Sequence, residues 1–245
     1  MINNTASTNK SDSLLANNQI HIWKIGTSYP SVEIESLYKN ILSSDERERA
    51  DRLRSENDKK RFIISRGQLR KSLSSYLKVS PCDIAFSYNK YGKPSIRSEH
   101  NLEKIKFNVS HSKNLVVFAI TQDREVGIDL EYIRKVNNAD KIVRRYFGKE
   151  ENQFYYSLPE SKKKLAFFTL WTRKEAYSKA RGMGIGIPGK KFDLNLTGRF
   201  QNNIRKNIDP DWSLIDIEIN ADYQAALAAE GKNLEICHYS INTTI

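Results

Sequence analysis

The order of the predicted helices and strands restricts the fold of this chain more than any other feature of its 245 residues. After a first strand at 19–25, helical segments at 45–57 and 59–77 precede a set of strands. Helices at 138–147 and 164–181 then precede a second set. We expect these strands at 84–88, 105–109, 115–121 and 126–130, and again at 191–196, 212–219, 223–229 and 234–239. Because helices and strands form separate blocks, the pattern predicts an α+β fold of two similar halves.

The first 18 residues differ in composition from the rest of the chain. Residues 1–18 are rich in Asn, Ser and Thr, which predicts a mobile polar tail. We therefore expect an N-terminal α+β half at 19–133 and a C-terminal α+β half at 134–245.

Two local signals refine the N-terminal half. Ser43 or Ser44 is suited to cap the very polar helix that follows. Asp123 and Arg124 lie between two strand-like runs and predict a turn, so those two strands are expected to form a hairpin.

Residues 126–131, with the sequence VGIDLE, form the most informative motif. Side chains alternate between the two faces of a strand. One face then carries Val126, Ile128 and Leu130, and the other carries Gly127, Asp129 and Glu131. Two carboxylates this close repel each other unless a cation such as Mg²⁺ binds between them, and the glycine leaves room for a ligand. The alternative is a strand end with two solvated acids.

The helix predicted at 164–181 supplies a third carboxylate. Trp171, Glu175 and Lys179 are spaced four apart, so they lie along one stripe of the helix. That stripe could present a carboxylate and an ammonium group to the same site. The alternative is an ordinary surface Glu–Lys pair, which stabilises a helix by only about 0.3–0.5 kcal/mol.

The charge of the chain indicates an anionic partner. There are 40 Lys and Arg residues against 29 Asp and Glu residues, which gives a net charge of +11. Nucleic acid, an anionic membrane, a phosphate-rich cofactor or an acidic protein would all fit this charge. Cys82 and Cys237 lie far apart, so neither a zinc site nor a disulfide framework is indicated, and a reducing cytoplasm is expected. Neither a signal peptide nor a membrane span is expected.

Five segments together resemble one enzyme family. They are, in chain order, YGKP (91–94), FNVSHS (107–112), GIDLE (127–131), RYFGKEE (145–151) and LWTRKEAYSKARGMGI (170–185). From about Leu42 to the C-terminus, the chain resembles the surfactin-synthetase-activating type of 4′-phosphopantetheinyl transferase. The resemblance implies that the two halves are related by pseudo-twofold symmetry and that the active site lies in the cleft between them.

The resemblance also implies a reaction. The phosphopantetheine arm of coenzyme A would be transferred to a serine of an acyl or peptidyl carrier protein, with release of adenosine 3′,5′-bisphosphate. Asp129, Glu131 and Glu175 are then expected to bind Mg²⁺, and Lys179 to stabilise the leaving phosphate. The catalytic base would be Glu151, although the adjacent Glu150 is an alternative.

The expected contacts to coenzyme A follow from the same motifs. The cofactor-binding residues that the resemblance implies are Arg61, Lys93, Pro94, Ser110, His111, Lys174 and Lys179. Taken alone, YGKP is also an ordinary turn, His111 could be a satisfied polar histidine, and Arg61 could be a solvated helix residue.

Two other classes of function compete with this interpretation. The first is a basic nucleic-acid-binding module, but only the net charge favours it, since no helix-turn-helix, zinc spacing or RNP-like motif is present. The second is a family member that has kept the fold and lost activity, but all three expected metal ligands are present. We therefore expect a cytoplasmic monomer that binds coenzyme A and an acidic carrier protein, with no specific nucleic acid and no membrane as partners.

Overall fold

The computed structural model describes residues 15–183 and 211–241. The strand predicted at 191–196 and most of the tail predicted at 1–18 lie outside these ranges. Leu15, within that expected tail, is buried. None of the helices in the described part of the chain combines the length and the apolar character needed to span a membrane.

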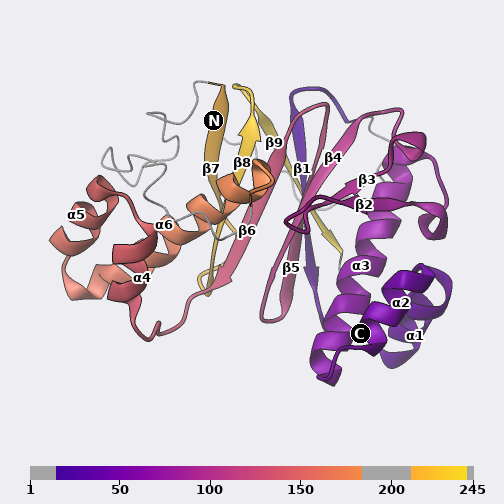
Figure 1. The fold of residues 1–245 in the computed structure, drawn as a ribbon, viewed down its shortest axis with the longest axis horizontal. Helices are drawn as coiled ribbons and strands as arrows, with labels where there is room; N and C mark the ends of the chain where they lie inside the picture. The colour runs from indigo at the N-terminus through magenta and orange to yellow at the C-terminus, as the bar shows by residue number, and fades with distance from the viewer. Residues whose placement is uncertain (1–14, 184–210, 242–245) are drawn as a thin grey trace.

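The described residues form four layers, with helices outside and two sheets inside (Figure 1). The helices are α1 (Ser31–Asn40), α2 (Ser44–Asp51), α3 (Glu56–Leu77), α4 (Ala139–Tyr146), α5 (Lys149–Ser157) and α6 (Glu160–Ala180). The first three cover one sheet, and the last three cover the other. This arrangement confirms the predicted α+β class with two halves that each combine helices and a sheet. The pseudo-twofold relation stays a prediction.

The first sheet has four strands in the order β4 (Ile105–Ser112), β5 (Leu115–Gln122), β1 (Gln19–Gly26) and β9 (Glu235–Ile241). β1 pairs antiparallel with β5 and parallel with β9. The C-terminal strand of the described chain therefore completes the sheet of the N-terminal half.

The second sheet has three antiparallel strands in the order β6 (Val126–Tyr132), β8 (Tyr223–Glu230) and β7 (Trp212–Ile217). A separate small hairpin is formed by β2 (Phe86–Tyr88) and β3 (Pro94–Ile96). β6 precedes the expected boundary at residue 133 and yet joins the second sheet, while β9 follows that boundary and joins the first. Each sheet therefore contains a strand from the other side of the expected boundary. The boundary itself stays a prediction.

The predicted hairpin between 115–121 and 126–130 is wrong, because these strands belong to different sheets. Arg124 donates a hydrogen bond of 2.8 Å to the carbonyl of Glu230, and the amide of Glu125 donates one of 2.9 Å to its carboxylate. These contacts attach the start of β6 to the end of β8. The turn residues thus direct the chain into the second sheet.

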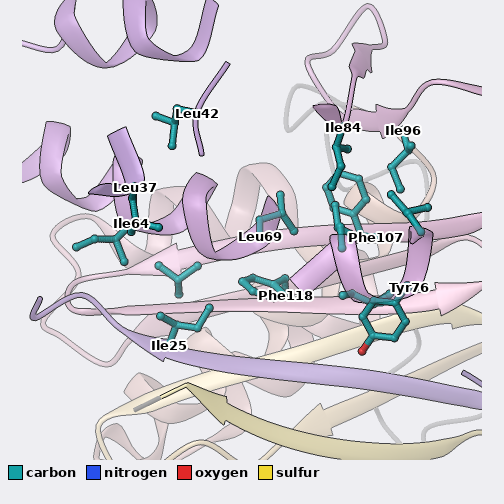
Figure 2. Close-up of a cluster of buried hydrophobic side chains, with 14 of the residues drawn as sticks. Ile25, Leu37, Leu42, Ile64, Leu69, Tyr76, Ile84, Ile96, Phe107 and Phe118 are labelled. Carbon is teal, nitrogen blue, oxygen red and sulfur yellow. The ribbon is translucent and has the colours of Figure 1, made fainter. Parts of the chain in front are cut away.

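Among the residues that the structure describes, three buried clusters hold the layers together. The first lies between α1–α3 and the first sheet, where Leu37, Ile64 and Phe118 pack together (Figure 2). The second lies between α4–α6 and the second sheet. The third fills the space between the two sheets and includes Ile128 and Leu130 of β6.

The observed ends of some helices differ from the predicted ends, because the sequence there is polar and shows no helical period of apolar residues. Ser43 is the N-cap of α2 and forms a capping box with Glu46, as one of the two predicted candidates. The helix predicted at 45–57 ends at Asp51, and Ser55 caps α3 by accepting a hydrogen bond from the amide of Asp58. The sequence did not predict α1, α5 or β3.

Candidate active site

The strand β6 presents its carboxylates to α6. Its apolar residues face the core between the sheets, so Asp129 and Glu131 lie on the opposite face, and the predicted alternation is confirmed. Asp129 is 5% exposed, which excludes a solvated strand end for this residue. Gly127 has a role other than the predicted one, because a Cβ there would lie 2.1 Å from the Ala176 carbonyl oxygen. The missing side chain makes room for α6, not for a ligand.

The helix α6 brings Lys179 to these carboxylates. The Lys179 ammonium group lies 2.6 Å from Asp129 Oδ1, 2.9 Å from Ser110 Oγ and 3.3 Å from the Ile128 carbonyl oxygen. Ser110, on β4, also donates a hydrogen bond of 3.0 Å to Asp129 Oδ1. The Lys179 cation thus binds β6 instead of forming the surface pair with Glu175 that was the alternative interpretation.

Glu175 lies one helical turn before Lys179 and is 8% exposed. Burial and the negative charges of Asp129 and Glu131 raise the pKa of Glu175 to about 7, and Lys179 offsets part of this effect. Three carboxylates from β6 and α6 therefore lie close enough to interact electrostatically.

The carboxylates suit a divalent cation chemically. Asp129 Oδ2 is buried and has no hydrogen-bond partner, which leaves a carboxylate oxygen available as a ligand. Within residues 15–183 and 211–241, no group of three His, Cys, Asp or Glu side chains is arranged to hold a metal ion as it stands. In this state Lys179 is paired with Asp129, and Arg134 with Glu131 at 2.9 Å. Oxygen donors, mutual repulsion and the unpartnered Asp129 Oδ2 nevertheless fit a hard cation such as Mg²⁺.

Arg61 and His111 lie beside this cluster on the side of the N-terminal half. Arg61, on α3, pairs with Asp58 and reaches the carbonyl oxygen of Lys113 at 3.5 Å, in the turn after β4. Partial burial and the positive charges of Arg61 and Lys179 lower the pKa of His111. The structure thus groups Arg61, His111 and Lys179 as neighbouring basic groups.

Lys93 and Pro94 line a different hollow, with a volume of about 420 Å³, beside the C-terminus of α6. The Lys93 ammonium group donates to Glu125 at 2.9 Å and to the Ala180 carbonyl oxygen at 2.9 Å. It therefore neutralises the negative end of α6 in this structure. Arg181 and Lys106 also line the hollow.

Glu151 and Lys174 pair with each other away from solvent. Their ion pair is 2.8 Å long, and Glu151 is fully buried at the N-terminus of α5, where it also accepts a hydrogen bond from the amide of Gly148. Glu150 is half-buried on the same turn. The structure thus places Lys174 against Glu151, on the buried side of α6.

Sequence reasoning missed two residues at this site. Asn108 and Ser112, on β4, accept hydrogen bonds from the amides of Ile128 and Tyr132 on β6. The signal was present in FNVSHS, where polar residues alternate along a predicted strand. Alternating Asn and Ser on a buried strand face need hydrogen-bond partners.

Enzymes that transfer phosphorus-containing groups commonly combine carboxylates that bind a divalent cation with several basic groups. This site has the same combination. Comparison with known proteins defines the class more narrowly. Residues 29–123 match the family model of the 4′-phosphopantetheinyl transferase N-terminal domain, and residues 125–228 match the model of the 4′-phosphopantetheinyl transferase superfamily.

Three relatives match this chain in sequence over 67–89% of its length. 4′-Phosphopantetheinyl transferase HetI of Nostoc sp. is 35% identical over 217 residues, which cover 89% of this chain and 90% of that protein. 4′-Phosphopantetheinyl transferase gsp of Aneurinibacillus migulanus is 36% identical over 171 residues, covering 67% and 69% of the two chains. Sfp of Bacillus subtilis is 28% identical over 166 residues, covering 68% and 71%.

A crystal structure of a holo-(acyl-carrier-protein) synthase from Bacillus anthracis in complex with CoA (3′,5′-ADP) aligns with 41% of this chain and 91% of that chain. The sequence identity is 23% and the TM-score 0.35. The family models and the relatives decide the assignment: this chain belongs to the two-domain, surfactin-synthetase-activating family of 4′-phosphopantetheinyl transferases. It is an enzyme that transfers 4′-phosphopantetheine from coenzyme A to carrier proteins.

Proposed function

We propose that this transferase depends on Mg²⁺ and modifies a serine hydroxyl of an acyl or peptidyl carrier protein, releasing adenosine 3′,5′-bisphosphate. The observation that carries the proposal is the cluster of three carboxylates, with Asp129 and Glu175 buried, Glu131 half-buried and one Asp129 oxygen unpartnered. These three residues would hold the cation. When bound, Mg²⁺ neutralises charge on the pyrophosphate as the phosphoanhydride bond breaks.

Lys179 is suited to act on the leaving group. Its ammonium group is half-buried and lies between Asp129 and Ser110, so a short displacement would bring it to a phosphate oxygen. An ammonium group in such a place stabilises negative charge that develops on the leaving phosphate. Ser110 would orient the same phosphate if its hydroxyl group, which now donates to Asp129 Oδ1, turned its hydrogen to a phosphate oxygen.

Arg61 and His111 are proposed to bind the 3′-phosphate of coenzyme A. They belong to different elements, α3 and β4, and their charges interact across the gap between them. A phosphate between the two would receive charge-assisted hydrogen bonds from both. The lowered pKa of His111 means that the phosphate must itself favour the protonated imidazole ring, or accept a hydrogen bond from the neutral one.

Lys93 and Pro94 are proposed to contact the nucleotide from the hollow beside α6. The hollow has the volume of a small-molecule site, and its lining carries Lys93, Lys106 and Arg181 against Glu125 and Glu230. Lys93 would contribute there through its aliphatic chain as well as its charge, because its ammonium group is already bound to Ala180 and Glu125.

Glu151 remains our proposed base for the serine proton, with Glu150 as the alternative. A base must come within hydrogen-bond distance of the hydroxyl group. Since Glu151 is fully buried against Lys174, the proposal requires the N-terminal turn of α5 to move when the carrier protein binds. Glu150 would need a smaller movement, because it is half-buried. The place of Lys174 among the coenzyme A contacts would depend on the same movement.

The partner is proposed to be an acidic carrier protein, and the enzyme is proposed to act as a monomer in the cytoplasm, without a specific nucleic acid or a membrane as partner. The net charge of +11 favours an acidic partner. The proposed site combines residues from both halves of the chain, and the thiols of Cys82 and Cys237 are free, as in a reducing compartment.

The test is the intact mass of an apo carrier protein after incubation with the enzyme, coenzyme A and Mg²⁺. We expect a gain of one phosphopantetheine arm, lost when EDTA removes the cation and lost when the acceptor serine is replaced by alanine. An unchanged rate in EDTA would contradict the metal-dependent mechanism. Modification of the serine-to-alanine carrier would contradict the proposed acceptor.

A further inference from the structure

The strands β4 and β6 lie against each other where the two sheets meet (Figure 1), but they form no ladder of backbone hydrogen bonds. Side chains of β4 take the place of such a ladder. The amides of Ile128, Leu130 and Tyr132 donate to Asn108 Oδ1, Ser110 Oγ and Ser112 Oγ, at 2.9, 3.2 and 3.0 Å respectively. We call Asn108, Ser110 and Ser112 the β4 polar row.

The two serines of the β4 polar row make a second, repeated contact. Ser110 Oγ donates to Asp129 Oδ1 at 3.0 Å, and Ser112 Oγ donates to Glu131 Oε2 in a longer contact of 3.5 Å. Each serine therefore accepts a hydrogen bond from the amide of one β6 residue and donates toward the carboxylate of the preceding β6 residue. The period of two is the same along both strands.

These bonds satisfy amides that lie away from water. Ile128 is fully buried and Leu130 is 1% exposed, and a buried amide without a partner costs about 1–3 kcal/mol. On its other side, β6 is fixed to β8 by strand pairing. The β4 polar row thus decides how the carboxylate-bearing strand is placed relative to the N-terminal half, which carries Arg61 and His111.

We propose that Ser112 and Asn108 are positioning residues for the transfer reaction, holding β6 so that Asp129 and Glu131 stand at the correct place opposite Glu175 to bind the cation. This inference rests on the proposed function, since it concerns the same three carboxylates. Ser112 acts on Glu131 as Ser110 acts on Asp129, and Asn108 fixes the start of the strand. Residues that orient metal ligands from behind typically change metal affinity about 10–100-fold when they are replaced.

The experiment compares Ser112→Ala with Ser112→Thr, which keeps the hydroxyl group on a strand that tolerates β-branched residues. Mn²⁺ binding to the purified protein is measured by electron paramagnetic resonance, without coenzyme A or carrier protein. We expect Ser112→Ala to bind Mn²⁺ about tenfold more weakly and Ser112→Thr to bind it almost as wild type. Asn108→Ala should weaken Mn²⁺ binding as well, with a lower melting temperature.

Kinetics give a second readout that a purely structural role would not produce. In Ser112→Ala, the Mg²⁺ concentration for half-maximal transfer should rise about tenfold, while kcat at saturating Mg²⁺ recovers most of its value. The matched control is Ser74→Ala, on α3, which removes a hydroxyl group that donates to the Val79 carbonyl oxygen at 2.6 Å, away from the carboxylates. It should leave Mn²⁺ affinity unchanged.

The outcomes separate this inference from the proposed function. Equal Mn²⁺ affinity in wild type and Ser112→Ala would overturn the positioning role even though the metal site exists. An equal loss of Mn²⁺ affinity in Ser112→Ala and Ser74→Ala would also overturn the positioning role. Weak Mn²⁺ binding by Ser112→Thr would overturn it as well. If the wild-type enzyme transfers the arm without any divalent cation, the metal site itself fails, and the inference fails with it.

Discussion

The ammonium group of Lys179 joins three elements of this enzyme. It extends from α6 and contacts Ser110 on β4 and Asp129 on β6. In this structure the ammonium group neutralises a carboxylate that Mg²⁺ is proposed to bind. A cation bound at Asp129 Oδ2 would place a second positive charge beside Lys179, and repulsion between the two would favour movement of Lys179 toward the substrate phosphates.

Replacing Asp129, Glu131 or Glu175 by alanine should abolish transfer and leave a folded protein. Removal of one carboxylate opens no large cavity, and the relief of repulsion among the three offsets the loss of the ion pair to Lys179 or Arg134. Circular dichroism should show native helix content, while the rate of carrier modification should fall by at least about a hundredfold. Near wild-type activity in Glu175→Ala would show that α6 supplies no ligand.

Arg61→Ala and His111→Ala should raise the KM for coenzyme A and leave kcat less affected. Both residues are proposed to bind the 3′-phosphate, so dephospho-coenzyme A, which lacks that group, should be nearly insensitive to the changes. The KM values of both substrates for wild type and variants decide the matter. If the variants raised the KM for coenzyme A and for dephospho-coenzyme A equally, Arg61 and His111 would have a role other than binding the 3′-phosphate.

At the scale of elements, the contact between α6 and β6 depends on the absence of a side chain at Gly127. A Cβ at this position would lie 2.1 Å from the Ala176 carbonyl oxygen and 2.3 Å from the Ala180 amide nitrogen. Both are backbone atoms, so the helix would have to move as a whole. Its movement would carry Glu175 and Lys179 away from Asp129.

Gly127→Ala should therefore lower both stability and activity. Overpacking at a rigid contact costs about 1–3 kcal/mol or more, which is a large part of the stability of an ordinary domain. Urea unfolding should show the loss, and transfer should fall further than the unfolded fraction explains. Gly26→Ala provides the control, since nothing lies within 4 Å of the corresponding Cβ.

The strand β1 carries a buried histidine that should make stability depend on pH. Burial lowers the pKa of His21 to about 4, with a smaller opposing effect from Glu235, and the ring bonds to the Tyr76 hydroxyl group at 2.8 Å. Between about pH 6.5 and pH 4 the unfolded chain binds a proton that the folded chain does not. This contribution to stability is therefore present above pH 6.5 and is lost as the pH falls toward 4.

His21→Gln removes this titration. Its free energy of unfolding should lie below that of wild type at pH 7.5, and the gap should narrow by about 2–3 kcal/mol as the pH falls to 4.5. Denaturant unfolding across this pH range measures the difference between the two proteins. If the difference in unfolding free energy between the two proteins stayed constant with pH, His21 would not contribute to the loss of stability in acid.

At the scale of the whole molecule, a segment rich in positive charge follows the strand that carries Asp129 and Glu131. Residues 134–149 follow β6 directly and contain one acidic residue, Asp140, and six basic residues: Arg134, Lys135, Lys141, Arg144, Arg145 and Lys149. The six basic side chains are exposed. A surface of this kind would guide an acidic carrier protein toward the carboxylates.

Arg144→Glu combined with Arg145→Glu should raise the KM for the carrier protein about tenfold and leave the KM for coenzyme A unchanged. The control is Arg54→Glu with Lys71→Glu, which changes the net charge equally at exposed positions of the N-terminal half. Raising salt from low to physiological levels should weaken carrier binding in wild type more than in the double variant, because exposed charges are screened within about 8–10 Å. Tight binding of DNA at physiological salt, without carrier modification, would favour the nucleic-acid hypothesis instead.

The sequence by itself determined the elements with strong periodicity and the identity of the carboxylates. The alternation in VGIDLE placed Asp129 and Glu131 on one face because a strand has a period of two, whatever surrounds it. The apolar side of 164–181 predicted α6, and five ordered motifs indicated the family that the comparisons confirmed. α1 and α5 were not predicted, since helices of only 10 and 9 residues are stabilised by tertiary packing more than by their own sequence.

Only the tertiary structure decided which strands pair and what Gly127 and Asn108 contact. Strand pairing between residues far apart depends on which apolar faces are buried together, so β6 pairs with β8, against the expected hairpin with β5, and β9 pairs with β1. Only the tertiary structure showed that Lys179 pairs with Asp129 and not with Glu175, because this contact depends on the distance between α6 and β6. Spacing along the chain fixes which side chains share a face, but contact across two elements is settled by the packing that brings the faces together.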